Sequence, residues 1–101
     1  MGPAGVGKQW HHIATISGKH EYKGIFKIMF EEAGMNIKKD PHNLIYMPHA
    51  GRHTITYHKL VLGKLTEATK GLTGSQYTKN LQNALDELRK DLIKDPRIPY
   101  K

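Results

Sequence analysis

Asp40-Pro-His-Asn-Leu-Ile-Tyr-Met-Pro-His-Ala-Gly-Arg-His53 is the stretch of sequence that decides the fold. It opens with Asp, Pro and Asn, a combination that is typical of a turn. The apolar run Leu44–Met47 then predicts a short strand, which Pro48 ends because proline has no amide proton to give to a sheet. His49 and His53 follow in a loop that leads to a helix. The stretch therefore predicts a strand joined to a helix by a histidine-bearing connection.

Upstream of this stretch, the sequence predicts another strand and a helix. The segment Gln9–Ile16 has β-branched and aromatic residues and is predicted to be a short strand or an extended loop. From Tyr22 onward, apolar residues recur at helical spacing, at positions 25, 26, 29 and 30. We expect this helix to stop near Gly34, because glycine readily adopts the left-handed conformation that ends a helix.

Downstream, two amphipathic helices are predicted. The first begins at Thr54 and has a buried stripe formed by Val61, Leu62, Leu65 and Ala68. Glycines at positions 71 and 74 interrupt the chain, and a last helix from Ser75 to Lys94 ends before Pro96. The order of strand, helix, strand, helix and helix predicts an α+β fold.

The length bounds the domain organisation. The 101 residues are enough for one domain with one modest core. We expect residues 1–8 to be a flexible lead-in, residues 9–95 to form the domain and residues 96–101 to form a C-terminal tail. No stretch approaches the roughly 20 apolar residues of a membrane span. There is no cysteine, so neither a disulfide nor a thiolate metal site holds the fold together.

The composition favours a polyanionic partner. The 16 Lys and Arg residues exceed the 9 Asp and Glu residues, which gives a formal net charge of +7. Such an excess indicates nucleic acid first and an anionic membrane surface second. The seven histidines are a stronger anomaly. At neutral pH an unprotonated imidazole serves as a metal ligand or a general base rather than as a solubilising charge.

The histidines suit hydrolysis of a phosphodiester, whose charge repels nucleophiles and whose leaving oxygen departs poorly. A general base that deprotonates water and a cation that stabilises the leaving oxygen address both problems. Adjacent residues of a strand point to opposite sides. One of His11 and His12 can therefore bind metal while the other faces the phosphate. In this interpretation, the side-chain carbonyl of Asn43 accepts a hydrogen bond from His12 and fixes its tautomer.

The later histidines are candidate metal ligands. His49 and His53 are four residues apart and would share one face of a helical turn. His58 lies on the same stripe as the apolar residues of its helix, so two interpretations stay open: a metal ligand, or a residue packed at the edge of the core. His20 and His42 have no comparable setting, and we expect both to be loop residues.

Taken together, these motifs resemble the AHH-type nuclease toxin domains of the HNH/endonuclease VII superfamily. The resemblance runs from about Trp10 to Leu92. It rests on an ordered set of motifs: Trp10-His-His-Ile13, Phe26 with Ala33-Gly-Met35, Asp40-Pro41-x-Asn43-Leu44, Pro48-His49-x-Gly51-x-His53 and Tyr57-His58. One departure is Trp10, where the motif that names the family has a small residue.

The resemblance implies a ββα-metal finger core packed with additional helices. It implies His12 as the general base, Asn43 as the base-orienting residue and His11 as a metal ligand, with further ligation from the segment that holds His49, His53 and His58. One divalent metal ion would be the cofactor. Three imidazoles suit Zn²⁺ or Ni²⁺, whereas one or two imidazoles with waters could use Mg²⁺ or Mn²⁺.

The resemblance also implies a biological setting. Such domains often form the C-terminal end of bacterial Rhs, contact-dependent or other polymorphic toxins. We therefore expect an endonuclease that is secreted or translocated within a larger toxin and acts in the cytoplasm of the target cell. DNA is favoured over RNA as the substrate, and a monomer is favoured. A cognate immunity protein is implied, and an acidic one would suit the charge of +7.

Two alternatives stay open from the sequence. The first is an RNase toxin on the same fold, because substrate preference lies in surface contacts that the sequence does not place. The second is a basic, histidine-rich module that binds nucleic acid or metal without catalysis. Substitution of His12 separates the second alternative from the enzyme, since only the enzyme needs that side chain for its activity.

Overall fold

The computed structural model describes residues 8–48 and 51–101. Strands β1 (Lys8–His12) and β2 (Leu44–Pro48) form a two-stranded antiparallel sheet. In its register His11 lies opposite Ile45 and His12 lies opposite Leu44. The long connection between the strands contains helix α1 (Tyr22–Glu32) and the short 3-10 helix η1 (Pro41–Asn43).

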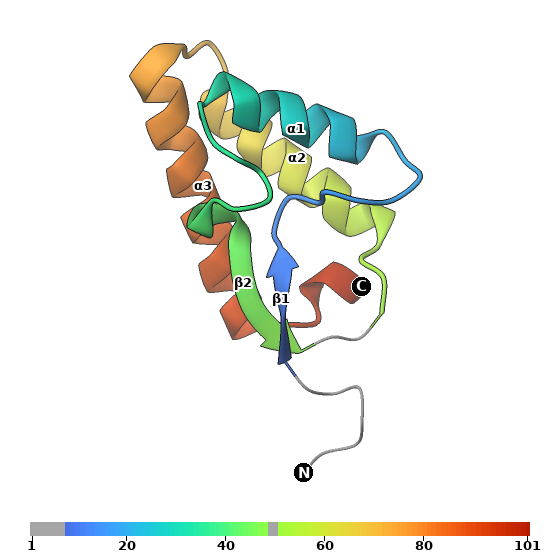
Figure 1. Cartoon of the computed structure of the whole chain (residues 1–101). Helices are drawn as coiled ribbons and strands as arrows, with labels where there is room; N and C mark the ends of the chain where they lie inside the picture. The colour runs from blue at the N-terminus through green and yellow to red at the C-terminus, as the bar shows by residue number, and fades with distance from the viewer. Residues whose placement is uncertain (1–7, 49–50) are drawn as a thin grey trace.

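The second half of the chain is helical. Helix α2 (Ile55–Thr69) follows the hairpin, and helix α3 (Gly74–Lys94) and the 3-10 helix η2 (Ile98–Tyr100) complete the chain. Helices α2 and α3 pack against each other, and α1 lies on α2 (Figure 1). The architecture is the predicted α+β class: an antiparallel hairpin followed by helices, consistent with a ββα core packed with additional helices.

The core lies between the hairpin and the helices. Its largest fully buried apolar side chains include the residue that follows β1 and residues of all three α-helices: Ile13, Phe26, Phe30, Val61, Leu65, Leu81 and Leu85. Burial of one such side chain stabilises the fold by roughly 1.5–3 kcal/mol. Among the described residues, no helix combines the length and the apolar character needed to cross a membrane.

The segment Gln9–Ile16, predicted to be a short strand or an extended loop, is a strand only in its first part, because β1 stops at His12. Ile13 leaves the sheet and is fully buried, and its amide donates to the carbonyl of Asn43 at 2.8 Å. The β-branched residues that indicated a longer strand are thus buried by tertiary packing rather than by strand pairing.

The start of α2 and the end of the chain stabilise each other. The hydroxyl of Thr54 caps the helix by accepting from the amide of Tyr57 at 3.1 Å. The amide of Thr54 donates to the carbonyl of Pro99 at 2.8 Å, and Pro99 is buried. The last residues, which the sequence suggested as a tail, therefore include a turn that packs against the beginning of α2.

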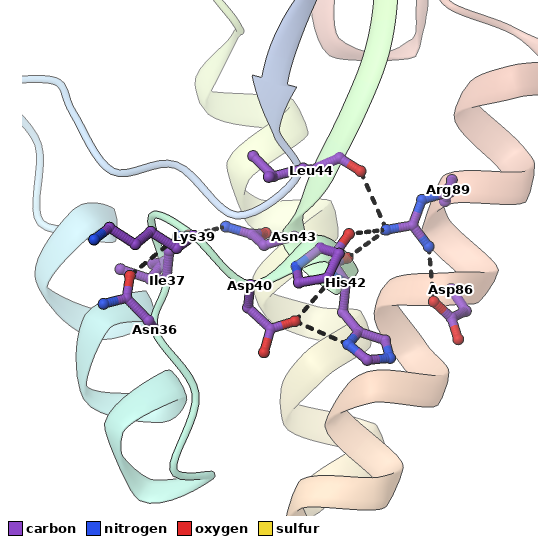
Figure 2. A network of polar contacts seen from close by, with 10 residues as sticks. Asn36, Ile37, Lys39, Asp40, His42, Asn43, Leu44, Asp86 and Arg89 are labelled. Atoms are coloured by element: carbon purple, nitrogen blue, oxygen red, sulfur yellow. Dashed lines mark hydrogen bonds and ion pairs between the residues drawn. The ribbon is translucent and has the colours of Figure 1, made fainter.

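Arg89 ties α3 to the hairpin (Figure 2). Its guanidinium donates to the carbonyls of Pro41 at 2.7 Å, His42 at 2.8 Å and Leu44 at 3.2 Å. A further bond to Asp86, at 2.7 Å, holds the guanidinium from its own helix. Because these carbonyls flank Asn43 in sequence, Arg89 fixes the backbone on both sides of that residue.

Candidate active site

Asn43 joins the chain segments that meet at the base of the hairpin. It is fully buried, and its side-chain oxygen accepts from the amide of Ala14 at 2.7 Å. Its side-chain nitrogen donates to the carbonyls of Ala14 at 3.0 Å and Ile37 at 2.9 Å. We call Asn43, Ile13, Ala14 and Ile37 the Asn43 junction. It fixes the backbone of the two residues that follow His12, at the point where the chain leaves the sheet.

His12 is oriented by a backbone carbonyl. Its Nε2 lies 3.0 Å from the carbonyl oxygen of Lys38. A carbonyl can only accept, so Nε2 carries the proton and donates it. In a neutral imidazole the other nitrogen, Nδ1, then has the free lone pair. The arrangement can therefore accept a proton at Nδ1, as a general base must.

The predicted hydrogen bond from His12 to Asn43 is wrong, since the Asn43 oxygen accepts from Ala14 and His12 bonds to Lys38. Asn43 still acts on His12 through the backbone. It holds the Ile37 carbonyl, one residue before the carbonyl that orients His12.

Asn36 secures the same peptide group from the other side. Its side-chain oxygen accepts from the amides of Lys38 at 2.9 Å and Lys39 at 3.0 Å. The amide of Lys39 belongs to the peptide unit whose carbonyl meets His12, so the bond fixes the plane of that unit.

Four histidines from separate segments gather beside the hairpin: His11, His20, His53 and His58, here called the histidine cluster. The rings of His11 and His53 are stacked with centroids 5.4 Å apart. The centroids of His53 and His58 are 6.3 Å apart, and those of His20 and His58 are 4.7 Å apart. The cluster thus connects β1, the loop after it, the segment that precedes α2 and the first turn of α2.

His58 is the most deeply buried histidine of the cluster, with 3 % of its surface exposed. Its Nδ1 is buried and has no hydrogen-bond partner. Burial lowers the pKa of His58, and the nearby His20 lowers it further. The imidazole is therefore neutral at neutral pH, which is the state that binds a metal ion.

Tyr57 anchors α2 across the cluster. Its hydroxyl donates to the carbonyl of Ile13 at 2.9 Å. Burial raises the pKa of the Tyr57 phenol well above its usual range, and Tyr100 raises it further. The phenol stays protonated and keeps this bond, which ties the residue after His12 to the helix that carries His58.

The structure brings His11, His53 and His58 together, whereas His49 lies outside the described residues. Within residues 8–48 and 51–101, no group of three or more His, Asp or Glu side chains is arranged so that it could hold a metal ion. The fit to a metal rests instead on buried imidazoles, of which the neutral His58 with its unbonded Nδ1 is the clearest.

The prediction that His20 lies in a loop is confirmed, but the sequence did not predict that this loop brings its ring next to His58. The ring of His20 lies against Gly18, where a Cβ atom would come within 2.5 Å of Nε2. Gly18 also has a φ of +110°, which favours glycine. Gly18 indicates a turn in the sequence, but a glycine alone does not predict where that turn places the side chain of His20.

Comparison with known proteins gives one match. A family model described as "A nuclease family of the HNH/ENDO VII superfamily with conserved AHH" matches residues 2–92. No curated protein and no solved structure gives a significant match. The family match confirms the resemblance inferred from the motifs, although Trp10 stands where the family's named motif has alanine.

Proposed function

Since the chain belongs to the AHH nuclease family of the HNH/ENDO VII superfamily, we propose that it hydrolyses DNA with His12 as the general base. Membership of the family makes it a metal-dependent phosphodiesterase. The observation that carries the role of His12 is its contact with the Lys38 carbonyl at 3.0 Å, because that contact leaves Nδ1 to accept a proton from water. A positioned general base accelerates such reactions about 10²–10⁴-fold.

We assign the divalent metal that is typical of this superfamily to the histidine cluster, where the family resemblance implies His11, His53 and His58 as candidate ligands and His49 as a further one. Since the described residues hold no group of three that is placed to bind one ion together, water or substrate would complete its coordination. When bound, the ion would polarise the phosphate and stabilise the leaving 3′ oxygen. Imidazole-rich sites suit Zn²⁺ or Ni²⁺, whereas Mg²⁺ or Mn²⁺ would need several water ligands. The neutral state of His58 supports its part in this assignment.

A basic groove supports a nucleic-acid substrate. The groove has a volume of about 550 Å³, and its lining includes Lys23, Lys27 and Lys38, with Glu31 as the acidic member. Lys38, whose carbonyl accepts from His12, is one of the residues that line this groove. Lysines in such a position neutralise phosphates. These contacts suit the backbone of either nucleic acid, and our preference for DNA rests on the resemblance to AHH-type toxins.

The biological setting is also a proposal. We place the chain at the toxic C-terminal end of a bacterial polymorphic toxin that acts in the cytoplasm of its target cell. The family resemblance supports this setting. An acidic immunity protein is the expected partner, because the net charge of +7 would make its association fast and salt-sensitive.

The test is cleavage of supercoiled plasmid by the purified chain with Mg²⁺, Mn²⁺, Zn²⁺ or Ni²⁺, alongside His12→Ala. The control is His42→Ala, because His42 bonds to Asp40 and lies outside the histidine cluster. We expect metal-dependent nicking that falls about 10²–10⁴-fold in His12→Ala and persists in His42→Ala. RNA is incubated in parallel. Cleavage of RNA alone would favour the RNase alternative, and no cleavage of either polymer would favour a non-catalytic binding module.

The proposed setting has its own test. Expression of the chain in the cytoplasm of a bacterium should arrest growth, and His12→Ala should relieve the arrest. Growth arrest that is equally strong with His12→Ala would contradict a toxicity based on catalysis.

A further inference from the structure

The loop that follows β1 places His20 beside His58 in the histidine cluster. The centroid of its ring is 4.7 Å from that of His58, with the two planes tilted by 48°. Tyr22, the first residue of α1, packs edge-on against the His20 ring at 5.4 Å. His20 thus has a defined place beside the most buried histidine of the cluster.

Both rings of this pair carry a nitrogen with nothing to bond to. Nδ1 of His20 and Nδ1 of His58 are buried and have no hydrogen-bond partner. Buried polar atoms are nearly always bonded in folded proteins, so an exception points to strain, function or an additional ligand. Two such atoms on adjacent rings favour an additional ligand that both can share.

The position of His20 is built into the loop. A Cβ atom on Gly18 would lie 2.5 Å from His20 Nε2, so only glycine leaves room for the ring where it stands. The φ of +110° at Gly18 makes the same demand on the backbone. The place of the His20 ring therefore depends on glycine at position 18, and another residue there would displace the ring.

We propose that His20 is a metal ligand that shares one divalent ion with His58 through the Nδ1 atoms of the two rings. The ion is of the class that prefers imidazole, such as Zn²⁺ or Ni²⁺. The inference deepens the proposed function, because it rests on the assignment of that function's metal to the histidine cluster and adds a ligand to it. The other coordination positions are left to water, substrate and the remaining histidines of the cluster.

The chemistry of the pair argues against a purely structural role. A pair of rings used only for packing could be phenylalanines, which would bury no polar atom. A ring-to-ring hydrogen bond would have satisfied both nitrogens with one proton, but neither Nδ1 atom has a hydrogen-bond partner. A shared cation satisfies both lone pairs at once.

Metal affinity of the purified chain tests the proposal without nucleic acid. Zn²⁺ binding is measured by competition with a chromogenic chelator for the unmodified chain, His20→Ala and His42→Ala. We expect His20→Ala to weaken Zn²⁺ binding at least about tenfold, which is the lower bound for loss of even an outer partner of a metal site. His42→Ala should stay within about twofold of the unmodified chain. Equal Zn²⁺ affinity of His20→Ala and the unmodified chain would overturn the proposal.

A second measurement needs no substitution. In ¹⁵N spectra of the imidazole rings, addition of Zn²⁺ should shift the Nδ1 resonances of His20 and His58 together. A His20 Nδ1 resonance that does not respond while Zn²⁺ binds would overturn the proposal, even if His20→Ala failed to fold. Plasmid nicking by the same preparation separates the two ideas. Nicking without a His20 response would contradict the role of His20 as a ligand and support the nuclease function. A His20 response without nicking would support the ligand and contradict the nuclease function.

Discussion

The Asn43 junction and the histidine cluster are both buried and polar, and both lie beside the hairpin, yet their hydrogen bonding differs. In the junction, both polar atoms of the Asn43 side chain are bonded to backbone groups. In the cluster, the Nδ1 atoms of His20 and His58 are buried without a hydrogen bond. The difference indicates that the junction holds the fold in place, whereas the cluster keeps bonding capacity for a ligand.

The largest expected effect on stability comes from the junction. Asn43→Ala removes the partners of the Ala14 amide and of two buried carbonyls. Since each buried polar group left without a partner costs about 1–3 kcal/mol, we expect the free energy of unfolding to fall by roughly 3–5 kcal/mol. Urea unfolding measures it. Asn80→Ala is the matched control, because Asn80 makes one partly buried bond to Ala68. An equal loss in both variants would contradict the role of the junction.

Arg89 supports the junction from α3, and its removal should have the next largest effect. Arg89→Met keeps an apolar stem but loses the bonds to the three carbonyls around Asn43. We expect a loss of about 2 kcal/mol in the free energy of unfolding. Arg97→Met is the control, because it removes an exposed arginine that forms an ion pair with Asp95. Its loss in the free energy of unfolding should be below about 1 kcal/mol. Thermal unfolding of the two variants measures both losses, and an equal loss in the two would contradict the role of Arg89.

The cluster should respond in the opposite direction. His58→Leu replaces a buried, unbonded nitrogen with an apolar side chain, so we expect the free energy of unfolding to stay constant or rise by about 1 kcal/mol. Zn²⁺ affinity should fall at least about tenfold in the same variant. Destabilisation as severe as that of Asn43→Ala would show that His58 holds the fold, and the contrast between the two regions would then be lost.

The smallest effect is expected outside both regions. Trp10 is 68 % exposed and packs against Tyr46 across the hairpin, with ring centroids 5.3 Å apart. Trp10→Ala restores the residue of the family motif. It should cost about 0.5–1 kcal/mol of stability through the lost aromatic pair and leave plasmid nicking unchanged. A large loss of nicking would mean that the tryptophan has a role in the site.

Much of the fold could be predicted because its signals are local. The apolar spacing placed α1 and α3 within one or two residues of their observed ends, and α2 begins at Ile55, one residue after its predicted start at Thr54. The end of β1 could not be predicted in the same way. Ile13 is buried through its bond to Asn43 and through packing from distant helices, and β-branched residues look alike in both settings.

The motifs named the histidines of the predicted site, but not how each side chain is placed. The family resemblance pointed to His11, His53 and His58, which the structure brings together, and to His49, which lies outside the described residues. The partner of His12 is a backbone carbonyl, and since every residue has one, no residue type marks Lys38. The place of His20 depends on the direction of a glycine turn, which spacing along the sequence does not encode.

The hydrogen bonds of the candidate site join residues that are far apart in the sequence. His12 is oriented by a residue 26 positions away, Asn43 bonds to Ala14 across 29 positions, and Tyr57 bonds to Ile13 across 44. Contacts of such high sequence separation form only when the chain has reached its native topology. An extended chain carries the histidines but forms neither the contact of His12 with Lys38 nor the histidine cluster, so the proposed catalytic site exists only in the folded chain.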